Sequence, residues 1–264
     1  MLKRFDHFDA PSGTALFRPV GGLPSVATQA CARDGLGPVS RPVISQTFMD
    51  RRFGPAIACA AVSPVIETLF AAVQHNPRIL NRLLHAKRSH APVYRHALAT
   101  AALMIALAGQ LGLPRGAVQT AGLAGLLLDI GLALLPAGQD HGSAAFLALP
   151  PRLRDQHVLR GHDCLTRDPR ISDAVARVCL LHHERMDGSG YPHGLHAPDI
   201  DLYSRMAAIC DAFDTGCCGG SDGVVRDPAA ALDLLRAEAS GFDAAILHQF
   251  TAMMQTVPAR SGRA

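Results

Sequence analysis

Two long apolar stretches, residues 97–113 and 121–136, constrain the fold of this chain most strongly. Each contains an interrupting polar side chain, Gln110 in the first and Asp129 in the second. A helix that spans a bilayer needs roughly 20 mostly apolar residues, so these interrupted stretches fit a buried hairpin of two helices better than a membrane anchor. We therefore predict an all-α protein that has this hairpin in its core and no membrane partner.

The helical pattern continues on both sides of the hairpin. Ser63 followed by Pro64 predicts the start of a helix, because serine caps helix N-termini and proline is tolerated at the first helical position. Apolar residues then recur at spacings of three and four, which is typical of a helix packed on one face. Further helices are predicted over residues 92–112, 116–132, 153–166, 172–182, 202–213 and 228–239.

Composition indicates how the rest of the chain is organised. Residues 1–62 are rich in glycine and proline, so we expect an N-terminal extension of unknown role, a helical domain over 63–255 and a flexible tail at 256–264. Asp6 and Asp9 fall where a signal peptide needs apolar residues, and the seven cysteines form no CxxC pair, so we expect a cytoplasmic protein. A net charge of +3 with 18% charged residues argues against a polymeric nucleic acid partner.

Polar side chains recur on the apolar faces of these helices, namely His96, Asp129, His162 and the pair His182-His183. A single histidine at such a place is more often a hydrogen-bonded core residue than a ligand. Together they indicate more, because unpaired buried polar groups cost ~1 to 3 kcal/mol each and a shared cation would satisfy them all. Imidazole and carboxylate suit a divalent transition metal (Fe, Mn, Ni or Zn), and a carboxylate between histidine groups suits one or two ions.

A long motif begins at the histidine pair and reads HHERMDGSGYPHGL over residues 182–195. It resembles the signature of the HD-GYP family, whose characterised members hydrolyse cyclic di-GMP. The resemblance extends from about residue 63 to 250 and includes Arg95-His96, Arg160-Gly161-His162 and the sequence ICDAFD at 209–214. It implies an HD-type helical bundle and a metal-dependent cyclic di-GMP phosphodiesterase-type signalling domain.

The resemblance also implies roles for single residues. His96, Asp129 and Asp211 would hold one metal ion, and Asp129 would bridge to a second ion held by His162, His182 and His183. The attacking water would lie between the ions, which makes Asp129 a catalytic residue, and Glu184 would assist catalysis by orienting a ligand histidine. The residues implied in substrate binding are Arg185, Gly190, Tyr191, Pro192 and Arg205.

Two departures from the family pattern bear on activity. The family has a His-Asp pair followed by Ile-Gly-Lys, whereas this chain has Leu128-Asp129 followed by Ile-Gly-Leu132. Leu128 removes an imidazole from the first metal site and Leu132 removes a cation near the phosphate, so catalysis should suffer more than folding. After Asp214 the family has an Arg-Pro-Tyr-Arg-like stretch, but this chain has a glycine-rich loop with Cys217 and Cys218. A redox or metal role for this cysteine pair is a weaker interpretation than an incidental one.

The sequence leaves three functions open. The chain is a metal-dependent phosphodiesterase with an incomplete first metal site, or it is a degenerate module without hydrolysis. Such a module would bind cyclic di-GMP or a signalling partner, for example a diguanylate cyclase-type protein. A helical scaffold without metals is the weakest alternative, because most of the expected ligand groups remain. The intact motif at residues 182–195 favours the enzyme.

Overall fold

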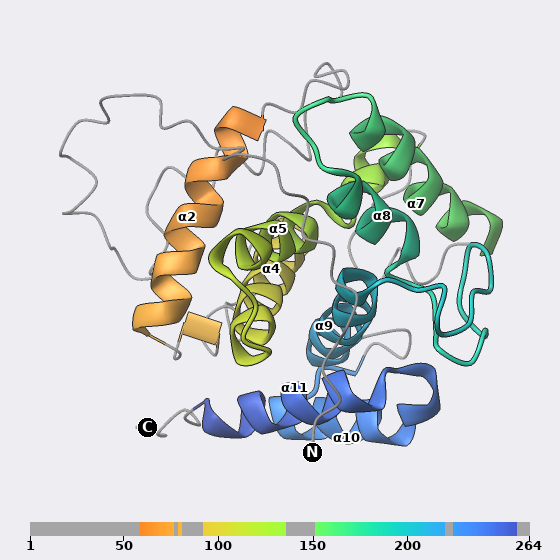
Figure 1. Cartoon of the computed structure of the whole chain (residues 1–264). Coiled ribbons are helices and arrows are strands. Elements are labelled where there is room, and N and C mark those ends of the chain that lie inside the picture. The colour runs from red at the N-terminus through yellow and green to blue at the C-terminus, as the bar shows by residue number, and fades with distance from the viewer. Residues whose placement is uncertain (1–58, 77–78, 81–91, 136–150, 220–223, 258–264) are drawn as a thin grey trace, which may run out of the picture. The chain divides into compact units, whose positions relative to one another are not determined.

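The computed structural model describes residues 59–76, 79–80, 92–135, 151–219 and 224–257 (Figure 1). All of them lie within the compact unit Cys31–Ala264. The predicted extension over residues 1–62 falls almost entirely outside the described residues, and so does most of the predicted tail at 256–264. The predicted division of the chain into three parts therefore stays a prediction.

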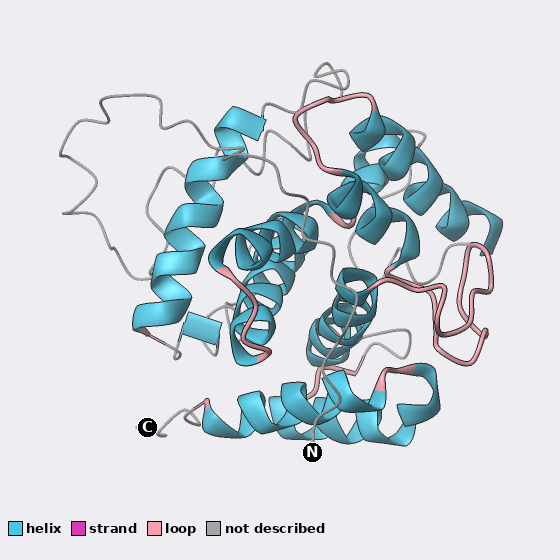
Figure 2. Ribbon diagram, viewed as in Figure 1, coloured by secondary structure: helices cyan, strands magenta, loops and turns pink. Residues whose placement is uncertain are grey.

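Helices make up the regular structure of the described segments, in which no strand occurs (Figure 2). In chain order the elements are α2 (Cys59–His75), α4 (Pro92–Gln110), α5 (Arg115–Leu127), the 3-10 helix η1 (Ile130–Leu134), α7 (Pro151–Thr166), α8 (Asp173–Leu181), α9 (Leu202–Cys218), α10 (Pro228–Ala237), the 3-10 helix η2 (Ala239–Gly241) and α11 (Ala244–Thr256). The prediction of an all-α fold is confirmed. None of the helices that the structure describes is long and apolar enough to cross a membrane.

Helices α4 and α5 form the hairpin that the two apolar stretches predicted (Figure 1). They are joined by a short turn at Gly112, whose φ of +72° favours glycine. Side chains of α4 such as Leu103, Met104 and Leu107 are fully buried. Helix α4 also contacts α2, α9 and α11. The side chain of His96, near the start of α4, is therefore carried into the core.

Glycine lets the two helices of the hairpin approach closely. A Cβ atom at Gly125 would lie 2.9 Å from the Cα atom of Ala101 and 2.9 Å from the carbonyl oxygen of Thr100. Both neighbours are backbone atoms, so an added side chain could fit only if the helices moved apart.

The ends of two helices differ from the prediction. Helix α2 begins at Cys59, so Pro64 lies inside it and Ser63 does not cap it. Packing outweighs the backbone hydrogen bond that the proline removes, because the apolar face of α2 is buried on both sides of it. Helix α9 continues to Cys218, beyond the predicted end at Phe213, and α11 was not predicted as a separate helix.

Replacing Gly125 with alanine should destabilise the fold, because the new methyl group would force apart the backbones of α4 and α5. We expect the free energy of unfolding to fall by about 1 to 3 kcal/mol, measured by chemical denaturation. Gly116→Ala is the matched control, because a Cβ atom at this helical position meets nothing within 4 Å. It should be neutral or stabilising by about 0.4 to 1 kcal/mol. Equal stabilities of the two variants would contradict the close packing.

Candidate metal centre

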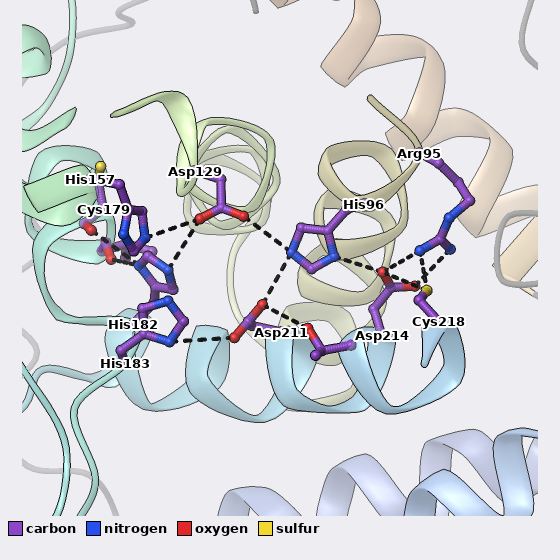
Figure 3. A network of polar contacts seen from close by, with 12 residues as sticks. Arg95, His96, Asp129, His157, Cys179, His182, His183, Asp211, Asp214 and Cys218 are labelled. Atoms are coloured by element: carbon purple, nitrogen blue, oxygen red, sulfur yellow. Dashed lines mark hydrogen bonds and ion pairs between the residues drawn. The ribbon is translucent and has the colours of Figure 1, made fainter. Parts of the chain in front are cut away.

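Four ligand-type side chains from separate segments meet inside the domain (Figure 3). Asp129 follows α5, His157 lies in α7, and His182 and His183 follow α8. Each offers one ligand atom, and these atoms all lie within 4.8 Å of one another. We call these four residues the Asp-His cluster.

Asp129 faces two imidazoles of the cluster directly. Its Oδ1 atom lies 3.3 Å from Nε2 of His157 and 3.5 Å from Nε2 of His182. Both of these imidazoles are fully buried. Nδ1 of His182 donates to the carbonyl oxygens of Val178 and Cys179, at 3.2 and 3.1 Å. The backbone of α8 thereby turns Nε2 of His182 toward the carboxylate.

The end of α5 sets the direction of the Asp129 side chain. A continuous helix was predicted up to residue 132, but α5 ends at Leu127 and η1 follows it. Asp129 has φ −102° and ψ 14°, in the sparsely populated bridge region where many active-site residues occur. The break in the helix thus places the carboxylate at the junction of α5 and η1, beside α7 and α8.

Two glycines bring η1 against α7. A Cβ atom at Gly131 would lie 1.8 Å from the carbonyl oxygen of His157, and one at Gly161 would lie 2.5 Å from Sγ of Cys179. Any larger residue at 131 would therefore push the turn away from the helix. This contact allows Asp129, two residues before Gly131, to reach the ring of His157.

The surroundings fix the charges of two members of the cluster. Burial opposes ionisation of Asp129, but the imidazoles of His157 and His182 hold the pKa of its carboxyl well below the usual value. Burial, reinforced by the neighbouring histidines, lowers the pKa of His183 well below that of a free imidazole. Near neutral pH the cluster therefore presents an anionic carboxylate and a neutral His183, the forms that bind metal ions.

The other oxygen of Asp129 faces a second set of groups. Its Oδ2 atom lies 3.4 Å from Nε2 of His96, and this nitrogen lies 3.1 Å from Oδ1 of Asp211. Oδ2 of Asp211 lies 3.7 Å from Nδ1 of His183. Burial works against a charge on His96, but the carboxylates of Asp211 and Asp214 raise the pKa of its imidazole well above the usual value. Asp129 thus stands between two histidine groups.

His162 was predicted as a metal ligand, but it belongs neither to the Asp-His cluster nor to the groups around His96. The histidine that α7 contributes is His157. The two residues point about 140° apart around a helix, so they cannot both face the same site. His162 was predicted because it lies on an apolar face of its helix, and this prediction is corrected to His157. The signal that could have identified His157 is Gly161, one helical turn later. This glycine marks the face of α7 that lies closest to η1 and α8.

Glu184 holds a loop, whereas it was predicted to orient a ligand histidine. Its buried carboxylate accepts hydrogen bonds from the backbone N–H groups of His193 and Leu195, at 2.7 and 2.9 Å. Within the same loop, the N–H of Tyr191 donates to the carbonyl oxygen of His183 at 3.2 Å. The ring of Tyr191 stacks on the ring of His183 with a centroid distance of 4.6 Å. The motif therefore ties the loop to the Asp-His cluster.

The two arginines predicted to contact phosphate are engaged elsewhere. The guanidinium of Arg185 lies over the ring of Phe242, 4.9 Å from its centroid. Arg205 donates to the carbonyl oxygen of Ile200 at 2.6 Å and pairs with Asp243 at 3.1 Å. In this arrangement both guanidiniums connect the motif and α9 to the C-terminal elements.

The turn at residues 190–192 packs against the end of α8. A Cβ atom at Gly190 would lie 2.4 Å from the backbone nitrogen of Arg185, so a larger residue would displace the turn. Tyr191 and Pro192 are half-buried beside it. The role of this turn in packing is thus explained, and contact of Gly190, Tyr191 and Pro192 with a substrate stays a prediction.

The positions that depart from the family pattern are buried. Leu128 and Leu132 are only 1% and 5% exposed. Cys217 and Cys218 lie in the last turn of α9 and not in the predicted glycine-rich loop. Burial, reinforced by Asp214, raises the pKa of the Cys217 thiol to about 12 and also raises the pKa of Cys218. Both thiols stay protonated near neutral pH, which argues against a redox pair.

Comparison with known proteins agrees with this geometry. The family model described as HD domain matches residues 77–246, so the chain belongs to the HD domain family. The chain is 40% identical over 182 residues to "Cyclic di-GMP phosphodiesterase PA4108" of Pseudomonas aeruginosa, a match that covers 66% of this chain and 42% of the relative. It is 35% identical over 130 residues to "3'3'-cGAMP-specific phosphodiesterase 1" of Vibrio cholerae, covering 46% of this chain and 28% of the relative.

A solved structure supports the same fold. The protein Bd1817 of Bdellovibrio bacteriovorus, described as an HDG"Y"P protein, matches with a TM-score of 0.52 and 18% identity over 81% of this chain and 78% of that chain. Together with the family match and the relatives, this confirms the HD-GYP-type domain predicted from the sequence. The chain spans less than half the length of the curated relatives that it matches.

Replacing Glu184 with alanine should loosen the loop that its carboxylate holds. The amide hydrogens of His193 and Leu195 would lose a charged acceptor, a loss of about 1.5 to 3 kcal/mol that corresponds to roughly tenfold to hundredfold faster hydrogen exchange. Exchange followed by NMR measures this directly. Asp187→Ala is the control, because Asp187 accepts from Ser189 in the same loop. Unchanged protection of His193 and Leu195 in the Glu184 variant would contradict the role assigned to Glu184.

Proposed function

We propose that this chain is a phosphodiesterase-type signalling domain that binds a divalent transition metal and hydrolyses cyclic di-GMP. The observation that supports the proposal most strongly is the Asp-His cluster, whose carboxylate and three imidazoles offer ligand atoms within 4.8 Å of one another. The relatives support the substrate class, because their names describe phosphodiesterases of cyclic di-GMP and of 3'3'-cGAMP.

The donor set of the cluster fits a bound metal ion. Oδ1 of Asp129 and Nε2 of His182 are buried and lack a well-formed hydrogen bond to the described residues. A buried polar atom in that situation costs about 1 to 3 kcal/mol, whereas a cation between these two atoms would satisfy both. Mixed nitrogen and oxygen donors suit Fe, Mn, Ni or Zn better than Mg or Ca, whose sites consist of oxygen.

A metal ion held by the cluster would activate a water molecule and neutralise charge on the phosphoryl group. The chain's own residues would fix the donors in advance. The low pKa of Asp129 keeps its carboxylate ionised, and the carbonyl oxygens of α8 hold Nε2 of His182 in its direction. Tyr191 limits rotation of the His183 ring by stacking on it. Such donors need little rearrangement when they bind the ion.

A module that binds cyclic di-GMP or a signalling partner without hydrolysis is the second candidate. Leu128 and Leu132 favour it, because they are buried apolar residues where the family pattern has an imidazole and an ammonium. A metal ion beside Oδ2 of Asp129 would then have His96, Asp129 and Asp211 as its protein ligands. Binding there would be weaker than with four protein donors, and chemistry that needs two ions would slow accordingly.

Replacing His157 with glutamine should remove most metal binding, because the cluster would lose one of its four donors. We expect the affinity for Mn²⁺ or Zn²⁺ to fall at least roughly tenfold, measured by titration of metal-depleted protein and by metal analysis. His162→Gln is the matched control from the same helix and should bind as the wild type does. Loss of binding in the His162 variant, with retention in the His157 variant, would reverse the assignment of the ligand.

Restoring the family residues should separate the two candidate functions. Under the first, the wild type hydrolyses cyclic di-GMP with added Mn²⁺ or Fe²⁺, and Leu128→His with Leu132→Lys increases the rate and the number of ions bound. Under the second, the wild type binds metal and the dinucleotide without turnover, and only the double variant hydrolyses it. The assay should include 3'3'-cGAMP as a second substrate, with thermal melting to confirm folding. A wild type that binds no transition metal would contradict both.

A further inference from the structure

A polar group that the function described so far does not use lies behind His96. Asp214, in α9, is fully buried and receives two hydrogen bonds from the guanidinium of Arg95, at 3.1 and 3.0 Å. The thiol of Cys218 lies against both Arg95 and Asp214. Oδ2 of Asp214 also lies 2.7 Å from Nδ1 of His96, a distance typical of a strong, charge-assisted hydrogen bond.

Helix α9 therefore contacts both nitrogens of the same imidazole (Figure 3). Asp211 faces Nε2, and Asp214, three residues later on the same side of the helix, faces Nδ1. A carboxylate can only accept, so the proton on Nδ1 of His96 points to Asp214 in either charge state of the ring. Nε2 then faces the space between Asp129 and Asp211.

We propose that Asp214, anchored by Arg95, is a positioning residue that orients His96 and fixes the tautomer in which Nε2 faces Asp129 and Asp211. The proposal rests on the metal-binding function proposed above, because an oriented Nε2 is useful there as a donor. Carboxylates that receive the second N–H of a ligand histidine set both its ring orientation and its basicity.

An ordinary buried ion pair explains less of this geometry. Arg95 alone already satisfies both oxygens of Asp214, so the fold needs no third partner for that carboxylate. Arg95 already supplies the positive charge that balances Asp214, so the contact with His96 is not needed for that purpose, and it removes the freedom of the ring to flip. Arg95 precedes His96 in α4, so a single turn of that helix supplies both the imidazole and the anchor of its partner.

The test is a set of metal titrations on the full chain. Asp214→Asn keeps the size of the side chain, but its amide oxygen should turn to Arg95 and its NH₂ group to His96. Nδ1 would then accept, and the proton would move to Nε2 and block it. We expect the affinity for Mn²⁺ or Zn²⁺ to fall roughly tenfold to a hundredfold in Asp214→Asn and in His96→Gln. The double variant should lose no more than His96→Gln alone, because Asp214 acts through His96.

A buried aspartate elsewhere in the chain provides the matched control. Asp168 is 5% exposed and pairs with Arg170 through two hydrogen bonds, at 2.8 and 2.7 Å, between α7 and α8. Asp168→Asn should lower the melting temperature without changing metal affinity. The ¹⁵N spectrum of histidine-labelled, metal-free protein gives an independent readout, with the His96 signals assigned from their absence in His96→Gln. Nδ1 should carry a proton in the wild type, whether or not Nε2 is also protonated, and should lose it in Asp214→Asn.

The outcomes separate this inference from the proposed function. A wild type that binds no metal would contradict the proposed function and this role with it. Binding by the wild type that Asp214→Asn leaves unchanged would overturn the positioning role alone. So would additive losses in the double variant, since a purely structural aspartate would act independently of His96. A wild type in which Nδ1 of His96 carries no proton would overturn it as well.

Discussion

The ionised carboxylate of Asp129, buried between two groups of imidazoles, is the interaction on which the rest of the site depends. One oxygen faces His157 and His182, and the other faces His96. A charge in an apolar core is strongly unfavourable unless partners are supplied, and here the partners come from separate helices. The helices that bury the charge are therefore the same ones that deliver nitrogen donors to it. Packing and site chemistry cannot be altered independently at this point.

Small residues make this convergence sterically possible. Gly125 lets α4 and α5 touch along their backbones, Gly131 does the same for η1 and α7, and Gly161 makes room for the Cys179 side chain of α8. The break after α5 matters equally, because η1 follows it and brings Gly131 against the backbone of His157. The apolar core thus serves the site mainly by fixing distances between backbones, and the polar side chains then reach one another without long extensions.

Much of the fold and of the site could be predicted from the sequence, because the signals involved are local. Helical periodicity located the hairpin and the inward side of His96, and the motif at residues 182–195 identified the histidine pair. His157 could not be found in this way. The residues just before it are mostly polar, so the sequence does not indicate a buried position, and His157 is buried by its contact with η1. The partners of Glu184 and of Arg205 were unpredictable for a related reason. Both sets of contacts depend on the path of a loop, and helical periodicity carries no information about that path.

The signature loop is attached to the far end of the chain as well as to the cluster. The N–H of Met186 donates to the carbonyl oxygen of Gly241 at 3.0 Å, beside the contact between Arg185 and Phe242. The C-terminal elements supply no donor to the Asp-His cluster, yet they brace the segment that follows its histidine pair. A fragment that stopped after α9 would keep every ligand and lose this brace. A displacement of α11 would therefore be transmitted to the histidine pair through the backbone hydrogen bond between Met186 and Gly241, which involves none of the ligands.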